Sequence, residues 1–504
     1  MDKKDSKTFL KNIGSVSIGI SISRILGYIR DMLIAQLLGA SLFADTFYAA
    51  YRIPNLFRRL FGEGSVSGAF VPVFTEYIET KTHKESQELL NIVFTTLLTI
   101  LLIITILGII FAKPITYIIA SGFKTTPEKM QLTVTLTKIM FPYLIFVCLA
   151  ALMMGTLNSL KKFFLSAVSS SFLNLSEILY VIFFAGLITL PQNQVKFLGV
   201  SVVIGGIGQY IAQQIGIWKN GIKTQLKYNF KHPGLTKIFK LILPMMFGFS
   251  IDQINVFINT IFASFLEHGS ITILYYANRL TQLPLALFGI AVTTVALPVM
   301  STNIARNEIE KMKSTLNFSL KTAMLYLIPC MVGFIIMGKP IIKLLFERGK
   351  FDSVASLKTY YTLIFYVTGL LSLSFSGLFA STFYSFKKTK LPVKIAFVSL
   401  ISNLIFIVLF IKPLKIYGLA LSSSLSSWIN TFLLGFFLNK KICKIGFRNI
   451  FITFSKILVA SIIMGVIIYI FNLFNYCLIL KVPITIILGM LSYFLSVKLL
   501  KIER

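Results

Sequence analysis

Acidic residues, histidine and cysteine are scarce in this 504-residue chain. It contains 18 Asp and Glu, 3 His and 4 Cys, and all charged residues together make up 13% of it, where soluble domains carry roughly 25%. So low a charge content excludes an ordinary water-soluble globule. The cysteines are far apart with no CxxC pair, and the histidines are equally scattered, so neither a disulfide framework nor an HExxH metal site is expected. No P-loop is present either, and we expect a protein that is not an enzyme.

Hydrophobic residues and basic residues are abundant. The hydrophobic share is 56%, and 49 Lys and Arg give a formal net charge of +31. A nucleic-acid-binding protein of this charge would carry a polar domain with its basic residues on one face, and the chain has no such domain. Apolar runs close to the ~20 residues that cross a bilayer recur from end to end instead. The sequence therefore predicts a polytopic membrane protein with no nucleic-acid partner.

Fourteen membrane-spanning helices are expected, which places both termini on the same side. Their ranges are 10–38, 43–78, 87–112, 132–159, 163–190, 196–218, 236–265, 270–300, 313–338, 354–386, 390–411, 415–439, 449–473 and 476–499. Lysine and arginine concentrate near both termini and in alternate loops, most densely at 219–240. Because short basic loops stay inside the cell, both termini are predicted to be cytoplasmic.

The chain contains an internal repeat with an offset of 226 residues. TLNSLKKFFL at 156–165 matches TFYSFKKTKL at 382–391, and AKPI at 112–115 matches GKPI at 338–341. Each copy holds six helices, so the two lobes share one orientation and are related by a pseudo-twofold axis along the membrane normal. We expect lobes at 1–225 and 226–445 and two appended helices at 446–504. Such lobes typically enclose a substrate cavity, which favours a transporter over a duplication that serves stability alone.

An arginine inside a predicted span costs roughly 2.5–3.5 kcal/mol. Three of the arginines in the spans stand out in this respect: Arg24, Arg58 and Arg279. One interpretation is pairing within the helix, as for Arg24 with Asp31 two turns away. The other is a water-filled cavity in which the planar guanidinium groups bind an anionic ligand such as a phosphate.

Other charged residues in the spans also carry two interpretations. Arg59 and Glu63, four residues apart, are spaced to pair on one helix, and Arg30 near a helix end can extend its side chain to the interface. Glu177 and Asp252 either bind a coupling cation or proton, or neutralise a neighbouring arginine.

Several segments closely resemble the MurJ (MviN) family of lipid II flippases, which belongs to the same exporter superfamily as the MATE transporters. They are SRILGYIRDMLIAQLLGA at 23–40, AD at 44–45 and RIPNLFRRLFGEGSVSGAFVPVFTEY at 52–77. The resemblance extends through 258–280 and 383–396, so it covers most of the chain. It implies an all-α, MATE-like fold of fourteen helices, with a lipid-tail groove formed by the last two helices and the second lobe.

The resemblance also implies a cationic cavity for a diphosphate-sugar headgroup. Carried over by position, the cavity arginines are Arg24, Arg30, Arg58 and Arg279, with Asp45 as the acid of the second span. Further polar residues expected to support the cavity or its gate are Asn55, Glu63, Asp252 and Asn278.

This chain departs from the family pattern in the eighth span. Asn278 precedes Arg279 where relatives often have aspartate, and Gln282 stands at a nearby acidic position. These two positions therefore offer no carboxylate for a gate, and Asp252 is the candidate substitute. The polar positions that face a sodium site in some relatives are Asn259 and Asn403, and we expect no sodium, metal or other cofactor.

The predicted function is a lipid II flippase that moves the undecaprenyl-diphosphate peptidoglycan precursor outward across the bacterial cytoplasmic (inner) membrane by alternating access. Expected partners are lipid II, membrane lipids and cell-wall synthesis enzymes, and either the membrane potential or a coupling cation supplies the energy. Three alternatives remain open: a flippase for another polyprenyl-diphosphate glycan, a multidrug or organic-cation antiporter, and a scaffold for cell-wall enzymes.

Overall fold

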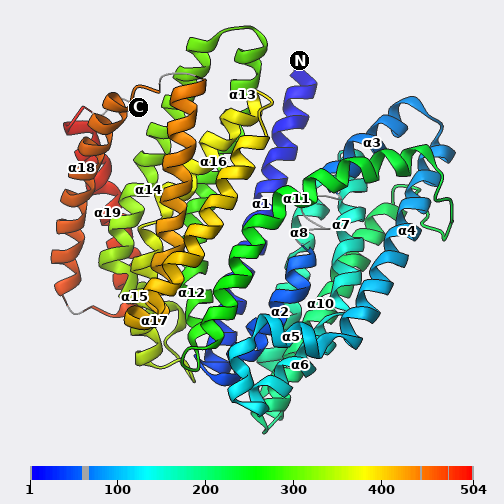
Figure 1. The fold of residues 1–504 in the computed structure, drawn as a ribbon, viewed down its shortest axis with the longest axis horizontal. Helices are drawn as coiled ribbons and strands as arrows, with labels where there is room; N and C mark the ends of the chain where they lie inside the picture. The colour runs from blue at the N-terminus through cyan, green and yellow to red at the C-terminus, as the bar shows by residue number, and fades with distance from the viewer. Residues whose placement is uncertain (1–2, 59–66, 443–444, 475, 502–504) are drawn as a thin grey trace. The chain divides into compact units, whose positions relative to one another are not determined.

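A computed structural model of the protein describes residues 3–58, 67–442, 445–474 and 476–501, without the side chains of 3–17, 67, 243–252 and 447. All regular structure in these ranges is helical (Figure 1). A helix satisfies its backbone hydrogen bonds within one segment, which is the requirement that a bilayer imposes on a spanning chain. The helices form two compact units, Met1–Gly269 and Ser270–Arg504. The repeat boundaries at 225 and 445 are a different division of the chain, and they stay a prediction.

Unit 1 contains eleven α-helices and three short π or 3₁₀ segments in its described part. Their bounds are α1 Lys3–Leu38, α2 Leu42–Phe57, α3 Ser67–Thr80, α4 His83–Ile110, α5 Ala112–Ile119, η2 Ser121–Thr125, α6 Pro127–Met140, α7 Tyr143–Ser159, α8 Phe163–Ser169, α9 Ser171–Leu179, η3 Tyr180–Phe184, η4 Ala185–Leu187, α10 Pro191–Trp218 and α11 Pro233–Ser264.

Unit 2 continues the same all-helical pattern. Its helices are α12 Ser270–Pro284, η5 Leu285–Ile290, α13 Ala291–Ala305, α14 Ile309–Phe346, α15 Ser353–Val367, α16 Leu370–Ser385, α17 Lys390–Lys441, α18 Phe447–Leu473 and α19 Leu478–Leu499. The two final helices pack against α14, and Tyr493 of α19 donates a hydrogen bond to the Leu325 carbonyl oxygen at 2.6 Å.

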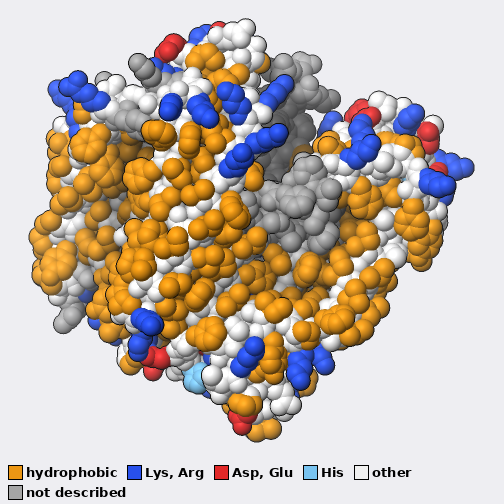
Figure 2. Space-filling view, in the orientation of Figure 1, with side chains coloured by type: hydrophobic (Ala, Val, Ile, Leu, Met, Phe, Trp, Pro, Cys, Tyr) orange, Lys and Arg blue, Asp and Glu red, His pale blue; other side chains and the backbone are white. Residues whose placement is uncertain are grey.

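Ten helical segments in the described part are long and apolar enough to cross a membrane. On the visible face of each unit, hydrophobic side chains cover a broad band, and lysine and arginine lie mainly toward its two ends (Figure 2). This distribution is that of an integral membrane protein, whose apolar surface faces lipid rather than water. The expected number of fourteen spans stays a prediction.

The 52-residue helix α17 consists of two helices joined by a kink, which lies at the predicted boundary between the spans 390–411 and 415–439. Lys415 interrupts it with φ 48° and ψ −124°, two residues after Pro413. A hydrogen bond from Ser399 to the Ser426 carbonyl oxygen, at 2.8 Å, shows that the chain folds back there. Gly418 is needed at this reversal, since a Cβ atom would lie 2.4 Å from the Phe410 carbonyl oxygen.

The predicted continuous span 43–78 is described as two shorter helices, α2 and α3, with residues 59–66 outside the described part. Pro54 lies inside α2 and Pro72 inside α3. Proline removes a backbone donor and bends the helix that contains it. Each of the two described helices of the predicted span 43–78 therefore contains a proline at which it can bend.

The internal repeat recurs as local geometry at the two Lys-Lys turns. Lys161 and Lys387, 226 positions apart, have φ values of 60° and 58°. The next residue in each turn donates its backbone N–H five residues back, Lys162 to Leu157 at 2.8 Å and Lys388 to Phe383 at 2.9 Å. Two turns of the same sequence motif thus close in the same way, which confirms that these segments are structural equivalents.

Candidate functional site

A buried ionic cluster in unit 1 centres on Arg30 of α1. Its guanidinium group donates to Asp31 Oδ1 from Nη2 at 2.6 Å and from Nε at 3.0 Å. Nη1 donates to Asn174 Oδ1 on α9 at 3.0 Å, and Glu177 Oε2 lies 3.6 Å from Nε. Arg30 is 9% exposed and both acids are at most 2% exposed, so two carboxylates compensate one cation away from water.

This geometry bears on two of the sequence interpretations. Arg30 does not extend to the interface, so the expectation of a side chain reaching out of the helix end is wrong. The reason is that Asn174 and Glu177 on α9 offer it partners inside the unit. Glu177 lies where an acid that neutralises a neighbouring arginine should lie, close to the Arg30 guanidinium. Asn174 also donates to the Ser23 carbonyl oxygen at 3.0 Å, which fixes α9 against α1.

Arg24 lies on the same helix, one and a half turns before Arg30. Its side chain is half-buried, and it makes no hydrogen bond or ion pair with any residue for which the structure describes a side chain. Asp31, its suggested partner, pairs with Arg30 instead. Arg24 therefore remains a candidate ligand for an anion.

Arg58 stands at the end of α2, where Asn55 holds it. Arg58 Nε donates to Asn55 Oδ1 at 2.9 Å, so Asn55 orients the Arg58 side chain, and its role in supporting a cavity stays a prediction. Two turns earlier Tyr51 stacks on Phe47, with ring centroids 6.0 Å apart, and tilts against Tyr143 of α7 at 6.2 Å. The inner side of α2 is thus a row of packed aromatic rings that ends in a cation.

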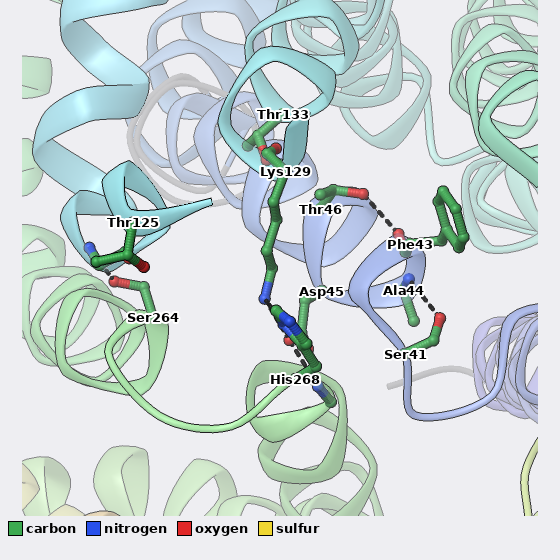
Figure 3. Close-up of polar contacts among 12 residues, drawn as sticks. Ser41, Phe43, Ala44, Asp45, Thr46, Thr125, Lys129, Thr133, Ser264 and His268 are labelled. Atoms are coloured by element: carbon green, nitrogen blue, oxygen red, sulfur yellow. Dashed lines mark hydrogen bonds and ion pairs between the residues drawn. The ribbon is translucent and has the colours of Figure 1, made fainter. Parts of the chain in front are cut away.

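A second ionic cluster surrounds Asp45 at the opposite end of α2 (Figure 3). Asp45 Oδ2 accepts from Lys129 Nζ at 3.0 Å and from the Gly269 backbone N–H at 2.7 Å. Lys129 Nζ also lies 3.3 Å from His268 Nδ1 and 4.0 Å from the centroid of the Phe123 ring. Asp45 is 1% and Lys129 2% exposed. Asp45 therefore ties the start of α2 to α6 and to the connection between α11 and α12.

Local structure places these groups. Ser41 caps α2 by accepting the Ala44 backbone N–H at 3.4 Å, which puts Asp45 in the first turn. A carboxylate is favoured there because the first backbone N–H groups of a helix carry a partial positive charge. Gly269 has φ 88°, and a Cβ atom on it would lie 2.4 Å from the Ala40 carbonyl oxygen. Only glycine therefore lets the α11–α12 connection approach this loop.

Sequence reasoning missed Lys129 and His268 as members of the Asp45 cluster. Lys129 counted only as a loop charge, and His268 as an isolated residue at a span end. Their one signal is position. Each residue lies just before a predicted span that starts on the same side of the membrane as the span that contains Asp45. That signal is too weak to select them from other loop residues.

In unit 2 the predicted site residues lie on α12. Asn278 and Arg279 are both half-buried, and Thr281 donates to the Asn278 backbone carbonyl oxygen at 2.8 Å. The π-helical segment η5 begins at Leu285, one residue after Pro284. Such segments often occur near functional sites, which agrees with the expected importance of the eighth span.

The structure thus brings Arg30, Asp31 and Glu177 together and holds Asp45 in a separate cluster. Glu63, with its suggested partner Arg59, and the side chain of Asp252 lie outside the described residues. Within the described part, no group of three His, Cys, Asp or Glu residues is placed to hold a metal ion. The role of the arginines in substrate binding stays a prediction.

Comparison with known proteins adds the family context. The family model described as "Lipid II flippase MurJ" matches residues 34–492. A protein of Buchnera aphidicola subsp. Schizaphis graminum named "Probable lipid II flippase MurJ" is 36% identical over 461 residues, which covers 90% of this chain and 88% of that relative.

Two solved structures share the fold. One is titled "Lipid II flippase MurJ, inward closed conformation", with a TM-score of 0.80 and 29% identity over 96% of this chain and 98% of that one. The other is an inward-facing multidrug resistance MATE family transporter, with a TM-score of 0.67 and 13% identity over 88% of this chain and 98% of that one. The second likeness is one of fold alone.

Proposed function

Because this chain belongs to the lipid II flippase MurJ family, we propose that it moves lipid II from the cytoplasmic to the outer leaflet of the bacterial cytoplasmic membrane. The observation that supports this most is the family match over residues 34–492, which includes Arg58, Asp45 and Arg279. The protein is accordingly an integral membrane transporter and not a catalytic enzyme. Its termini are assigned to the cytoplasm by the lysine-rich loops.

In this proposal Arg24, Arg58 and Arg279 bind the diphosphate of the substrate. A guanidinium group presents two parallel donors that match two phosphate oxygens, so binding is strong and oriented. Arg30 acts in support, because all three of its guanidinium nitrogens already face Asp31, Asn174 or Glu177. It fixes the position of α1, on which Arg24 stands.

Transport proceeds by alternating access, with the site open first to one side of the membrane and then to the other. The Asp45 cluster supports the outer gate, since it holds the α11–α12 connection, which the predicted topology places outside. The lipid tail remains in the bilayer while the headgroup crosses.

The membrane potential is the proposed source of energy. One elementary charge that crosses 100 mV changes its free energy by about 2.3 kcal/mol. Outward movement of an anionic headgroup from a negative interior is therefore downhill, and so is the return of an empty cationic site.

The experiment is lipid II flipping in vesicles with an imposed potential. Arg279→Ala should abolish flipping while the protein still inserts and folds, because the diphosphate loses a ligand. Arg306→Ala is the matched control: it removes an exposed arginine at the end of α13 and should leave flipping unchanged. Normal turnover by the Arg279 variant would refute the diphosphate clamp, and indifference to the sign of the potential would refute the electrical part.

The same assay addresses the exact substrate, and co-purification addresses the partners. Polyprenyl-diphosphates that carry other glycans should compete weakly with lipid II if the sugar and peptide are recognised. A direct partnership with cell-wall synthesis enzymes, which we propose because they produce and consume lipid II, should appear as co-purification from native membranes.

A further inference from the structure

The connection between α10 and α11 is an extended segment that lies against a spanning helix. Residues 222–229 have no helical turns, and the segment lies beside α4 (Figure 1). Gly221, with φ 78°, turns the chain after α10, and Ile222 is then buried at 5% exposure. The segment is thus packed against the rest of unit 1.

Regular hydrogen bonds hold this segment along α4. Gln87 donates to the Lys223 carbonyl oxygen at 3.0 Å. The backbone N–H of Gln225 donates to Asn91 Oδ1 at 2.9 Å, and that of Lys227 donates to Thr95 Oγ1 at 2.8 Å. Two residues of extended chain advance ~6.6 Å and four residues of helix ~6 Å, so the two stay in register.

Along this series of hydrogen bonds, the segment runs from the polar start of α4 toward the apolar part of α4. The polar start of α4 ends at Glu88, and the seven residues from Glu88 to Thr95 rise ~10 Å. Lys227 spans this change from polar to apolar. Its backbone bonds to Thr95 in the apolar part of α4, while its Nζ lies 2.7 Å from Glu88 Oε1 at the end of the polar part. A lysine that bends back from an apolar level toward a polar one is typical of a membrane interface.

The outward side of the segment is apolar and aromatic. Leu226, Tyr228 and Phe230 are 65%, 63% and 63% exposed, and the rings of the latter two lie 6.2 Å apart. Alternate residues of an extended chain face the same side, so these three form one surface, with its backbone fixed from behind.

The charged side chains of the segment itself have one sign. Residues 219–232 contain no acid, and their lysines are Lys219, Lys223, Lys227 and Lys231. Lys227 pairs with Glu88, which leaves the other three for a ligand. Aromatic side chains at interfacial depth with lysines above them match the boundary between acyl chains and anionic headgroups.

We propose that residues 222–231, the interfacial loop, insert Leu226, Tyr228 and Phe230 into the bilayer and bind anionic phospholipid headgroups through Lys223 and Lys231. The loop thereby anchors unit 1 to one leaflet. This goes beyond the proposed transport of lipid II and does not depend on it, because the lipids it recognises are those of the surrounding membrane.

The chain supplies its own reporter for a test. It has two tryptophans, and Trp218, 56% exposed, ends α10 just before the loop. In the full-length Trp428→Phe variant, quenching of Trp218 by brominated phosphatidylglycerol and by brominated phosphatidylcholine gives the relative binding of the two lipids. A lysine near an anionic surface contributes about a fivefold preference, equivalent to about 1 kcal/mol. Lys223→Gln with Lys231→Gln should therefore lower the preference by roughly 25-fold at most.

Matched variants separate the outcomes. Lys311→Gln with Lys313→Gln, at the start of α14 in another basic loop, should leave the preference at Trp218 unchanged. A spin label at Tyr228→Cys should be accessible to oxygen in the bilayer, whereas one at Glu79→Cys, exposed at the end of α3, should be accessible to an aqueous reagent. An aqueous label at position 228 would overturn the insertion. An unchanged lipid preference in the loop variant would overturn headgroup binding, and protection of position 228 only by another protein would assign the surface to a protein partner.

Discussion

The two units, Met1–Gly269 and Ser270–Arg504, fill their interiors with different chemistry. In unit 1 the buried polar side chains include Arg30, Asp31, Asp45, Lys129 and Glu177. In the described part of unit 2 the buried polar side chains are serine, threonine and asparagine. The two Lys-Lys turns have the same backbone conformation, whereas the buried polar side chains of the two units differ in kind.

Hydroxyl groups and charges stabilise helix contacts in different ways. Between α16 and α17, Ser372 Oγ donates to Ser427 Oγ at 2.8 Å, and Thr431 donates to the Ser372 carbonyl oxygen at 2.7 Å. Small residues allow this close approach, since a Cβ atom on Gly369 would lie 2.7 Å from Ser424 Oγ. Each such contact contributes little free energy, so little is lost when it is removed. Breaking a buried ion pair costs much more free energy. The ion pairs of unit 1 therefore restrict its helices to few packing arrangements.

The largest expected effect comes from Arg30→Ala. It leaves Asp31 and Glu177 buried without their cation, and loss of one partner from a buried ion pair costs about 3–5 kcal/mol. Thermal unfolding of the purified protein should show this loss, and flipping should fall with it. Arg30→Lys, which keeps the charge without the planar fork, should be intermediate. An Arg30→Ala protein as stable as the parent would remove the contrast between the units.

An intermediate effect is expected from the Asp45 cluster. Asp45→Asn leaves the Lys129 charge buried and should destabilise unit 1 by about 3 kcal/mol. Lys129→Met combined with Asp45→Asn should recover part of that loss, with a coupling energy of about 1–3 kcal/mol. Unfolding of the two single variants and the double variant measures this coupling. Additive losses would mean that the 3.0 Å pair contributes nothing beyond its separate members.

The smallest effect should come from Ser372→Ala in unit 2. Interhelical hydrogen bonds in membranes average about 0.6 kcal/mol, so stability should fall by about that amount and flipping should be unchanged. Ser402→Ala is the control, because Ser402 is half-buried on α17 and donates within its own helix to the Val398 carbonyl oxygen. A loss from Ser372→Ala as large as that from Arg30→Ala would show that hydroxyl contacts are as decisive as charges.

Much of the fold was predictable because its signals are local. Apolar runs of spanning length fixed the helices, and Pro413 marked the reversal that Lys415 makes in α17. Prediction was weaker where a break depends on packing: the single predicted span 163–190 is α8, α9, η3 and η4. Hydropathy does not distinguish an α-helical turn from a π-helical one.

The candidate site was predictable in its members and not in its contacts. The family resemblance named Arg24, Arg30, Arg58 and Arg279, and the cost of charge in a bilayer singled out most of them independently. The partners of Arg30 and Asp45 were out of reach, because Asn174 is 144 residues from Arg30 and Gly269 is 224 residues from Asp45. No periodicity in a single sequence encodes separations of that size.

By itself the sequence determined the class of protein, most of its helices and the residues whose charge needs an explanation, since each follows from local apolarity, and a repeated motif predicted its duplication. Only the tertiary structure decided which charges compensate each other and that residues 222–231 lie along α4 with an apolar surface outward. The physical reason is that the free energy of a buried charge depends on groups within a few ångströms in space, and folding chooses those groups from anywhere in the chain.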